Sequence, residues 1–384
     1  MSRDRATPLF DPKPWQRRAS PLARAALLTY AVLVIYAGLA LWSGWRDLGV
    51  GAFAFLAAPL PRHITAFDLI VNVVGYLPFG ALAVLALHPR VRGLSALALA
   101  TLAGVLLSGC IEALQTFLPR RVASNVDLAT NTLGALLGAL LVLPFAASLI
   151  DRGRLAQLRA RWFTRESTAL LVVLALWPAA QTAPGPMLFA NGALFDGPAL
   201  LVALGWATPL QIAAAFGASE FVLAEALVVV AGTLAAGLAL TATLQPAAPR
   251  LALMLVLLCA ALLARGFAYA TAFGPERAFL WLTPGAIGGL CLGALVLLVV
   301  LLAATQGRRG VLAGAAVLAA LVWLTAVNLV PQNPYHVDWL ARYRPGRLVH
   351  FQSLATWLAA AWPLLLLAAL AALPWQRRRR QRRR

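Results

Sequence analysis

Apolar runs of about twenty residues recur along the whole chain, and this pattern constrains the fold more than any other feature. A run of that length forms an α-helix that crosses the hydrocarbon core of a bilayer. Apolar residues make up 61% of the chain and charged residues 12%, which excludes an ordinary soluble globular domain. The sequence therefore predicts an all-α fold, a polytopic transmembrane helix bundle.

We expect about ten membrane spans, since connections rich in arginine, glycine or proline separate the apolar runs. Their approximate ranges are 25–42, 68–87, 94–118, 127–150, 168–180, 219–244, 251–273, 286–305, 311–330 and a last span that ends near residue 373. An even number of spans places both termini on one side of the membrane. Arginines are concentrated in the connections on that side, so the positive-inside rule predicts that both termini are cytoplasmic.

A basic segment at 151–165 divides the chain into two membrane domains. It carries arginines and apolar residues at helical spacing, which predicts an amphipathic linker helix on the inner leaflet. The remaining regions are a basic arm at 1–24, a four-helix domain at 25–150, a second domain of about six helices at 166–375 and an arginine-rich tail at 376–384.

The net charge of +19 would suggest a nucleic-acid partner in a soluble protein. Here the arginines lie between apolar runs, so topology explains the charge, and we expect membrane lipids rather than nucleic acid as partners. Cys110, Cys259 and Cys291 fall inside apolar runs, which argues against a disulfide framework or a zinc site. Without a phosphate-cradling loop, a His-rich metal motif or a nucleophile elbow, neither a cofactor nor a metal is expected. The oligomeric state stays open.

The pattern Asp-x-x-x-Asn-x-x-Gly occurs twice in the first half, beginning at Asp68 and again at Asp127. Residues three and four apart share a helix face, so each copy places its polar groups on one face. Both spans run from outside to inside, which makes the two copies parallel. Each aspartate lies at the outer end of its helix, and Asn72 and Asn131 lie one turn deeper, about 6 Å along the axis.

The intervening span runs the other way, and its outer end carries Glu112 and Gln115 on one face. The connection that follows carries Arg120 and Arg121. Because a charged side chain at the bilayer centre costs about 2.5–3.5 kcal/mol on insertion scales, we expect these groups to face the bundle interior or an aqueous cleft. The candidate ligand-binding residues are Asp68, Asn72, Glu112, Gln115, Arg120, Arg121, Asp127 and Asn131.

A purely structural role explains part of this pattern. The segments that begin at Thr65 and Ser124 fit the capping box, so each aspartate has a role in starting its helix. Gly134-x-x-x-Gly138 fits close helix packing, and Pro78 fits a kink. Capping does not explain the asparagines one turn deeper or the acid and amide on the opposing span, so a binding site is the preferred interpretation.

The second half contains one pair of intramembrane charges at matching depth, Glu225 and Arg265. Pairing lowers the cost of burying either charge, so we predict an ion pair; the alternative is that Arg265 extends to the interface alone. A Gly- and Pro-rich segment after the fifth span is expected to be re-entrant or interfacial. In the last outer loop, His336 and Asp338 are a weak candidate for an acid–base pair.

The motifs of the first half occur in a fixed order: Asp68…Asn72…Tyr76-x-Pro78-Phe79-Gly80, Glu112-x-x-Gln115, Arg121, and Asp127…Asn131…Gly134…Gly138. Together they resemble the VanZ-like family of bacterial membrane proteins over about residues 25–150. The founding member is associated with low-level resistance to the glycopeptide teicoplanin. The resemblance therefore implies a cell-envelope role in the bacterial inner membrane and implies no particular reaction.

The leading hypothesis is a binding or modulating protein whose outer-leaflet polar cleft recognises a lipid-linked envelope precursor or shields it from glycopeptides. Arg120 and Arg121 would bind phosphate or carboxylate, and Asn72 and Asn131 would supply hydrogen bonds. One alternative is a membrane enzyme that acts on such a lipid, with Glu112 or Asp127 as general base; whether the protein is an enzyme stays uncertain. Another alternative is a transporter, suggested by the parallel repeat.

Overall fold

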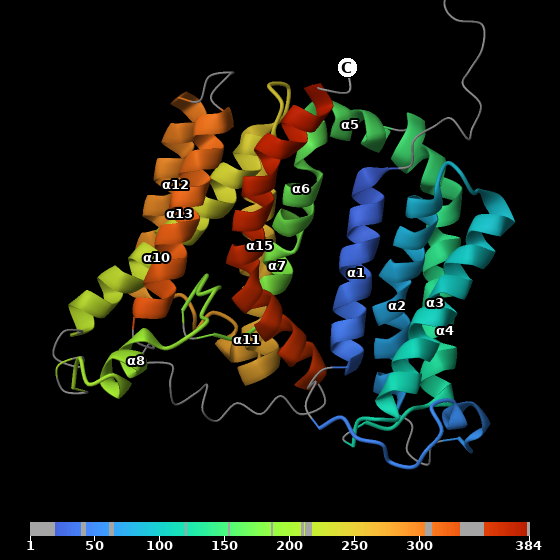
Figure 1. The fold of residues 1–384 in the computed structure, drawn as a ribbon. Helices are drawn as coiled ribbons and strands as arrows, with labels where there is room; N and C mark the ends of the chain where they lie inside the picture. Colours follow the sequence, from blue (N-terminus) through green and yellow to red (C-terminus); the bar gives the residue numbers. More distant parts are fainter. Residues whose placement is uncertain are drawn as a thin grey trace, which may run out of the picture. The chain divides into compact units, whose positions relative to one another are not determined.

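The computed structural model is helical along nearly all of the chain that it describes (Figure 1). The described residues are 20–39, 44–60, 65–119, 121–152, 154–185, 187–208, 211, 217–303, 309–330 and 349–381. The chain divides into two compact units, Met1–Arg159 and Ala160–Arg384. This division falls within the basic segment at 151–165 that the sequence singles out as a linker.

Nine helices in the described part of the chain are long and apolar enough to span a membrane. They are α1 (Pro21–Leu39), α2 (Ala66–Leu87), α3 (Gly93–Gln115), α4 (Asn125–Val142), α10 (Ala218–Thr243), α11 (Arg250–Phe273), α12 (Pro284–Ala303), α13 (Arg309–Leu329) and α15 (Val349–Gln381). The predicted polytopic all-α bundle is confirmed. The cytoplasmic placement of the termini stays a prediction.

The predicted fifth span is shorter than the others and is broken into α6 (Thr168–Ala175) and α7 (Trp177–Ala180). Pro178 causes the break, because it lacks the backbone N–H that would continue the hydrogen-bond ladder. At the other end of this unit, α15 continues to Gln381, so the first residues of the predicted tail are helical. A short helix, α5 (Arg154–Trp162), occupies the linker, and α8 (Gly197–Ala203) follows the irregular segment after α7.

In the N-terminal unit, α2 and α4 pack with their backbones in close approach. A Cβ atom placed on Gly134 would overlap the carbonyl oxygen of Val73, and one on Gly138 would overlap that of Leu77. The contacts advance in the same direction along both helices, so α2 and α4 are parallel, as predicted from the repeat. Only glycine permits this approach, which places the polar ends of the two helices side by side.

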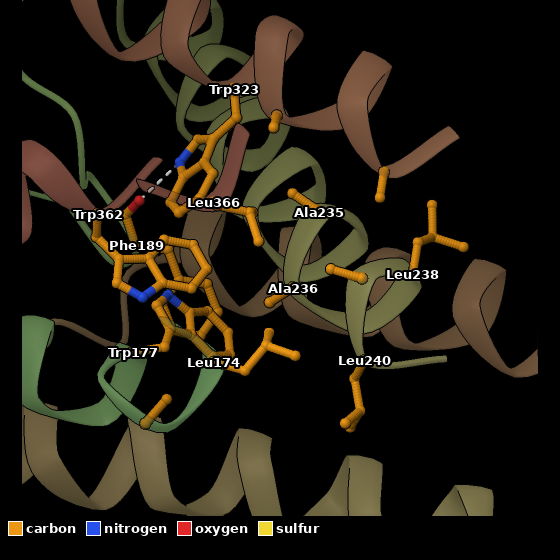
Figure 2. Packing of buried hydrophobic residues seen from close by; sticks show 14 of the residues in the cluster. Leu174, Trp177, Phe189, Ala235, Ala236, Leu238, Leu240, Trp323, Trp362 and Leu366 are labelled. Carbon is orange, nitrogen blue, oxygen red and sulfur yellow. Dashed lines mark hydrogen bonds between the residues drawn. The ribbon is translucent and has the colours of Figure 1, made fainter. Parts of the chain in front are cut away.

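The core of the C-terminal unit is built around aromatic side chains from α7, α13, α15 and the irregular segment (Figure 2). The ring centroids of Trp177 and Phe189 lie 4.7 Å apart, and Trp362 stacks on Trp177 at 5.7 Å. The indole N–H of Trp323 donates to the Phe189 carbonyl at 2.8 Å. Aromatic packing and this hydrogen bond thus hold the irregular segment inside the helices.

The irregular segment between α7 and α8 has its backbone carbonyls satisfied by buried side chains. The Arg265 guanidinium donates to carbonyls at 183, 185 and 187, and Asn328 on α13 donates to the Gly192 carbonyl at 2.7 Å. Leu188 and Phe189 are fully buried. Non-helical backbone persists at membrane depth only where protein or water satisfies it, and here protein side chains do so.

Candidate functional site

The polar groups of the N-terminal unit come together where α2 and α4 begin and where α3 ends. Asn72 on α2 donates through Nδ2 to Asp127 Oδ1 at 2.9 Å and to the Thr130 hydroxyl at 3.3 Å, both on α4. The close approach of the two helices is what brings the Asn72 amide within reach. Both Asn72 and Asp127 are half-buried, so this part of the cluster stays accessible from outside.

Glu112 connects α3 to the start of α4. Its side chain is 2% exposed, and Oε2 accepts the backbone N–H of Ser124 at 2.8 Å. Ser124 is the N-cap of α4, and its hydroxyl accepts from the backbone N–H groups of Val126 and Asp127. A carboxylate at a helix N-terminus lies at the positive end of the helix dipole, which stabilises the negative charge there.

Arg121 supplies the positive charge of the cluster. Its Nη2 donates to the Ala37 carbonyl of α1 at 2.9 Å, whereas its buried Nε has no hydrogen-bond partner. Burial lowers the pKa of the Arg121 guanidinium, and the nearby carboxylates of Glu112 and Asp127 oppose that shift. One donor of this cation is therefore available to a ligand that reaches it.

A second layer lies deeper in the bundle. Asn131 on α4 donates to the Ser108 hydroxyl on α3 at 3.0 Å, and its buried Oδ1 has no partner. A buried amide oxygen without a donor costs free energy, so Asn131 Oδ1 can accept a further hydrogen bond. Gln115 lies at the end of α3 rather than in this deeper layer, and it donates to the Gly38 carbonyl on α1 at 2.9 Å.

Asp68 differs from the rest of the predicted site. It is exposed, and it forms a capping box with Thr65: its carboxylate accepts from the Thr65 hydroxyl at 2.6 Å, and its own backbone N–H donates back at 3.2 Å. The structure therefore gives Asp68 the helix-starting role that the sequence offered as the alternative. Arg120, His336 and Asp338 lie outside the described residues.

Three residues that sequence reasoning did not select belong to the cluster. Ser108 lies one turn before Glu112 on the same face of α3, a spacing that would have revealed it. Thr130 adjoins Asn131 and lies three positions after Asp127, and its hydroxyl is the second acceptor for Asn72. Tyr30 on α1 donates to the Gly75 carbonyl at 2.8 Å, and no pattern in the sequence distinguishes it from other aromatic residues of its span.

In the C-terminal unit, Glu225 and Arg265 are both buried, at 1% and 3% exposure, but each has a partner other than the opposite charge. Arg265 donates to the carbonyls of the irregular segment, and Oε2 of Glu225 accepts from the Thr283 hydroxyl at 2.6 Å. Between these two described residues the predicted direct ion pair does not form, because the irregular segment supplies closer acceptors to the guanidinium.

Comparison with known proteins identifies the unit that carries the cluster. The sequence pattern of the VanZ/LLP1 family matches residues 24–147, which cover most of α1 and all of α2, α3 and α4. No curated protein and no solved structure matches the chain. The chain is thus a multi-span membrane protein, and its N-terminal part, over residues 24–147, is a VanZ/LLP1 family domain.

Proposed function

We propose that the VanZ/LLP1 domain binds the head group of a lipid-linked cell-envelope precursor at the outer leaflet of the bacterial inner membrane, and that this binding modulates glycopeptide sensitivity. The VanZ family is associated with glycopeptide resistance. The observation that carries the proposal is the half-buried Arg121, whose Nε has no partner, beside two carboxylates and the Asn72 amide.

The chemistry of these groups favours a head group that combines phosphate with hydroxyl or amide groups. Arg121 offers an N–H donor and a positive charge to a phosphate oxygen. Asp127, which already accepts from Asn72, has acceptor capacity for a sugar hydroxyl, and Asn131 Oδ1 accepts a further donor. A polyprenyl phosphate that carries a sugar presents both kinds of group.

Binding is measured by native mass spectrometry of the full-length protein in detergent, with a polyprenyl monophosphate and a polyprenyl-linked sugar as probes. Arg121→Gln is compared with Arg90→Gln, an exposed arginine in the turn between α2 and α3 that carries the same charge change. We expect Arg121→Gln to weaken binding of both lipids about tenfold or more, since a hydrogen bond to a charged group contributes about 1.5–3 kcal/mol.

Arg90→Gln should bind both lipids as the wild type does. Equal affinity of wild type and Arg121→Gln would contradict the proposal. If the bound lipid were converted to a product by the wild type but not by Glu112→Gln, the domain would be an enzyme rather than a binding protein.

A further inference from the structure

The C-terminal unit contains a buried carboxyl group that forms no ion pair with any described residue. Glu225 lies on α10, packed against the start of α12, and is 1% exposed. Oε2 accepts from the Thr283 hydroxyl, whereas the buried Oε1 has no hydrogen-bond partner. A carboxylate in this position would be left with half of its acceptor capacity unused.

Glycine residues on α12 leave the space that the Glu225 carboxyl group occupies. A Cβ atom on Gly285 would lie 2.5 Å from Glu225 Oε2, so only glycine at that position leaves room for the carboxyl group. Further along α12, Gly289 packs against the α10 backbone at Ala226, and Gly293 packs against Thr233. Glu225 is thus held inside the α10–α12 contact, and any change in its charge acts on that contact directly.

The groups that face Glu225 do not neutralise a negative charge. On α11, Arg265 is occupied by three backbone carbonyls, and the Tyr269 hydroxyl donates to the Gly185 carbonyl at 2.6 Å. In the described part of the unit, α6, α12 and α13 place no acidic or basic side chain beside it; Cys291 on α12 is exposed. The N-terminus of α12 favours negative charge, which offsets part of the cost of burial but supplies no donor to Oε1.

We propose that Glu225 is a proton-binding site within the membrane, and that its bound proton holds α10 against α12. A protonated carboxyl donates through Oε2–H to the Thr283 oxygen and leaves no unpaired charge in the interface. A metal cation is disfavoured at the same position, because no three His, Cys, Asp or Glu side chains come together there among the described residues. Loss of the proton would place an unpaired carboxylate in the interface and loosen it.

The test is the thermal unfolding midpoint of the full-length protein in detergent, measured from about pH 6 to about pH 9. Glu225→Gln mimics the protonated carboxyl, and Glu220→Gln on the same helix is the control, because Glu220 is exposed. A proton bound in the folded state stabilises it at low pH and is lost as the pH rises. Across this range the wild type and Glu220→Gln should therefore lose roughly 5 °C more than Glu225→Gln loses.

Identical pH profiles for the wild type and Glu225→Gln would overturn the proposal, as would a Glu225→Gln midpoint well below that of the wild type at low pH. Stabilisation of the wild type by sodium at high pH, absent from Glu225→Gln, would show a metal-cation site instead. If Glu225→Gln does not fold, infrared spectra of the wild type and Glu225→Asp decide. The proposal requires a protonated-carboxyl band near neutral pH that shifts in Glu225→Asp, and a spectrum without that shift contradicts it.

Discussion

The two copies of the Asp-x-x-x-Asn-x-x-Gly pattern have the same residues at the same spacing and different roles. In α2, Asp68 is exposed and caps its own helix, and Gly75 faces open space. In α4, Asp127 accepts from Asn72, and Gly134 packs directly on the backbone of α2. The aspartate and the glycine of the α2 copy thus take no part in the contact between the helices, whereas Asp127 and Gly134 build that contact and, with Asn72, the polar cluster.

Packing explains this difference. The close backbone contacts pair Val73 with Gly134, Leu77 with Gly138 and Gly80 with Ala135. In this packing, equivalent residues of the two copies do not meet: Asn72 donates to Asp127 and Thr130 rather than to Asn131. Two identical patterns on parallel helices therefore need not form a symmetric site, and only the packed register decides which polar groups meet.

The glycines provide the largest expected contrast between the two copies. Gly134→Ala places a methyl group on the Val73 carbonyl and forces α2 from α4, which we expect to cost about 1–3 kcal/mol of unfolding free energy. Gly75→Ala meets no atom within 4 Å and gains up to about 1 kcal/mol of helix propensity. Unfolding in graded denaturant measures both, and an equal loss in the two variants would show that the two helices do not pack in this register.

The asparagines provide the next contrast. Ser108→Ala leaves the buried Asn131 amide without a partner on either side, which we expect to cost about 1–2 kcal/mol. Thr130→Val removes the longer of the two bonds from the half-buried Asn72 and the bond from the Thr130 hydroxyl to the Val126 carbonyl within α4, with an expected cost of about 0.5–1 kcal/mol. Unfolding in graded denaturant measures both losses of stability. A larger loss for Thr130→Val would contradict the account, because it would show that the Asn72 hydrogen bonds contribute more than the buried Asn131–Ser108 bond.

A further small effect concerns the packing of α1 on the α2 copy. Tyr30→Phe removes one hydrogen bond to the Gly75 carbonyl while keeping the ring, and we expect a loss of about 0.5–1 kcal/mol. A Tyr30→Phe variant as stable as the wild type would mean that water replaces this bond.

The helices could be predicted from the sequence because bilayer-length apolar runs leave little choice of structure. The depth of charged residues in the membrane could also be predicted, because Glu225 and Arg265 lie inside apolar runs. Their partners could not, because the carbonyls at 183, 185 and 187 belong to an irregular segment whose path has no periodic signal. The sequence indicates that the span containing Pro178 is short. It does not indicate that the segment after this span is buried against the helices.

The predicted cluster was accessible to sequence reasoning only in part. Helical spacing places Asn72, Glu112, Asp127 and Asn131 on inward faces, but it does not set the register between helices. Thus the Asn72–Asp127 hydrogen bond, which joins the two copies of the pattern, could not be anticipated. For Asp68 the sequence could not distinguish helix capping from ligand binding, because both use an aspartate at a helix start.

The central claim is that the aspartate of the α4 copy, and not the aspartate of the α2 copy, belongs to the ligand site. The most direct test is the affinity of a polyprenyl-linked sugar for Asp127→Asn and Asp68→Asn, measured side by side in nanodiscs. Asp127→Asn should weaken binding about tenfold, while Asp68→Asn should leave the affinity unchanged. Equal losses in both variants, or a loss confined to Asp68→Asn, would contradict this assignment.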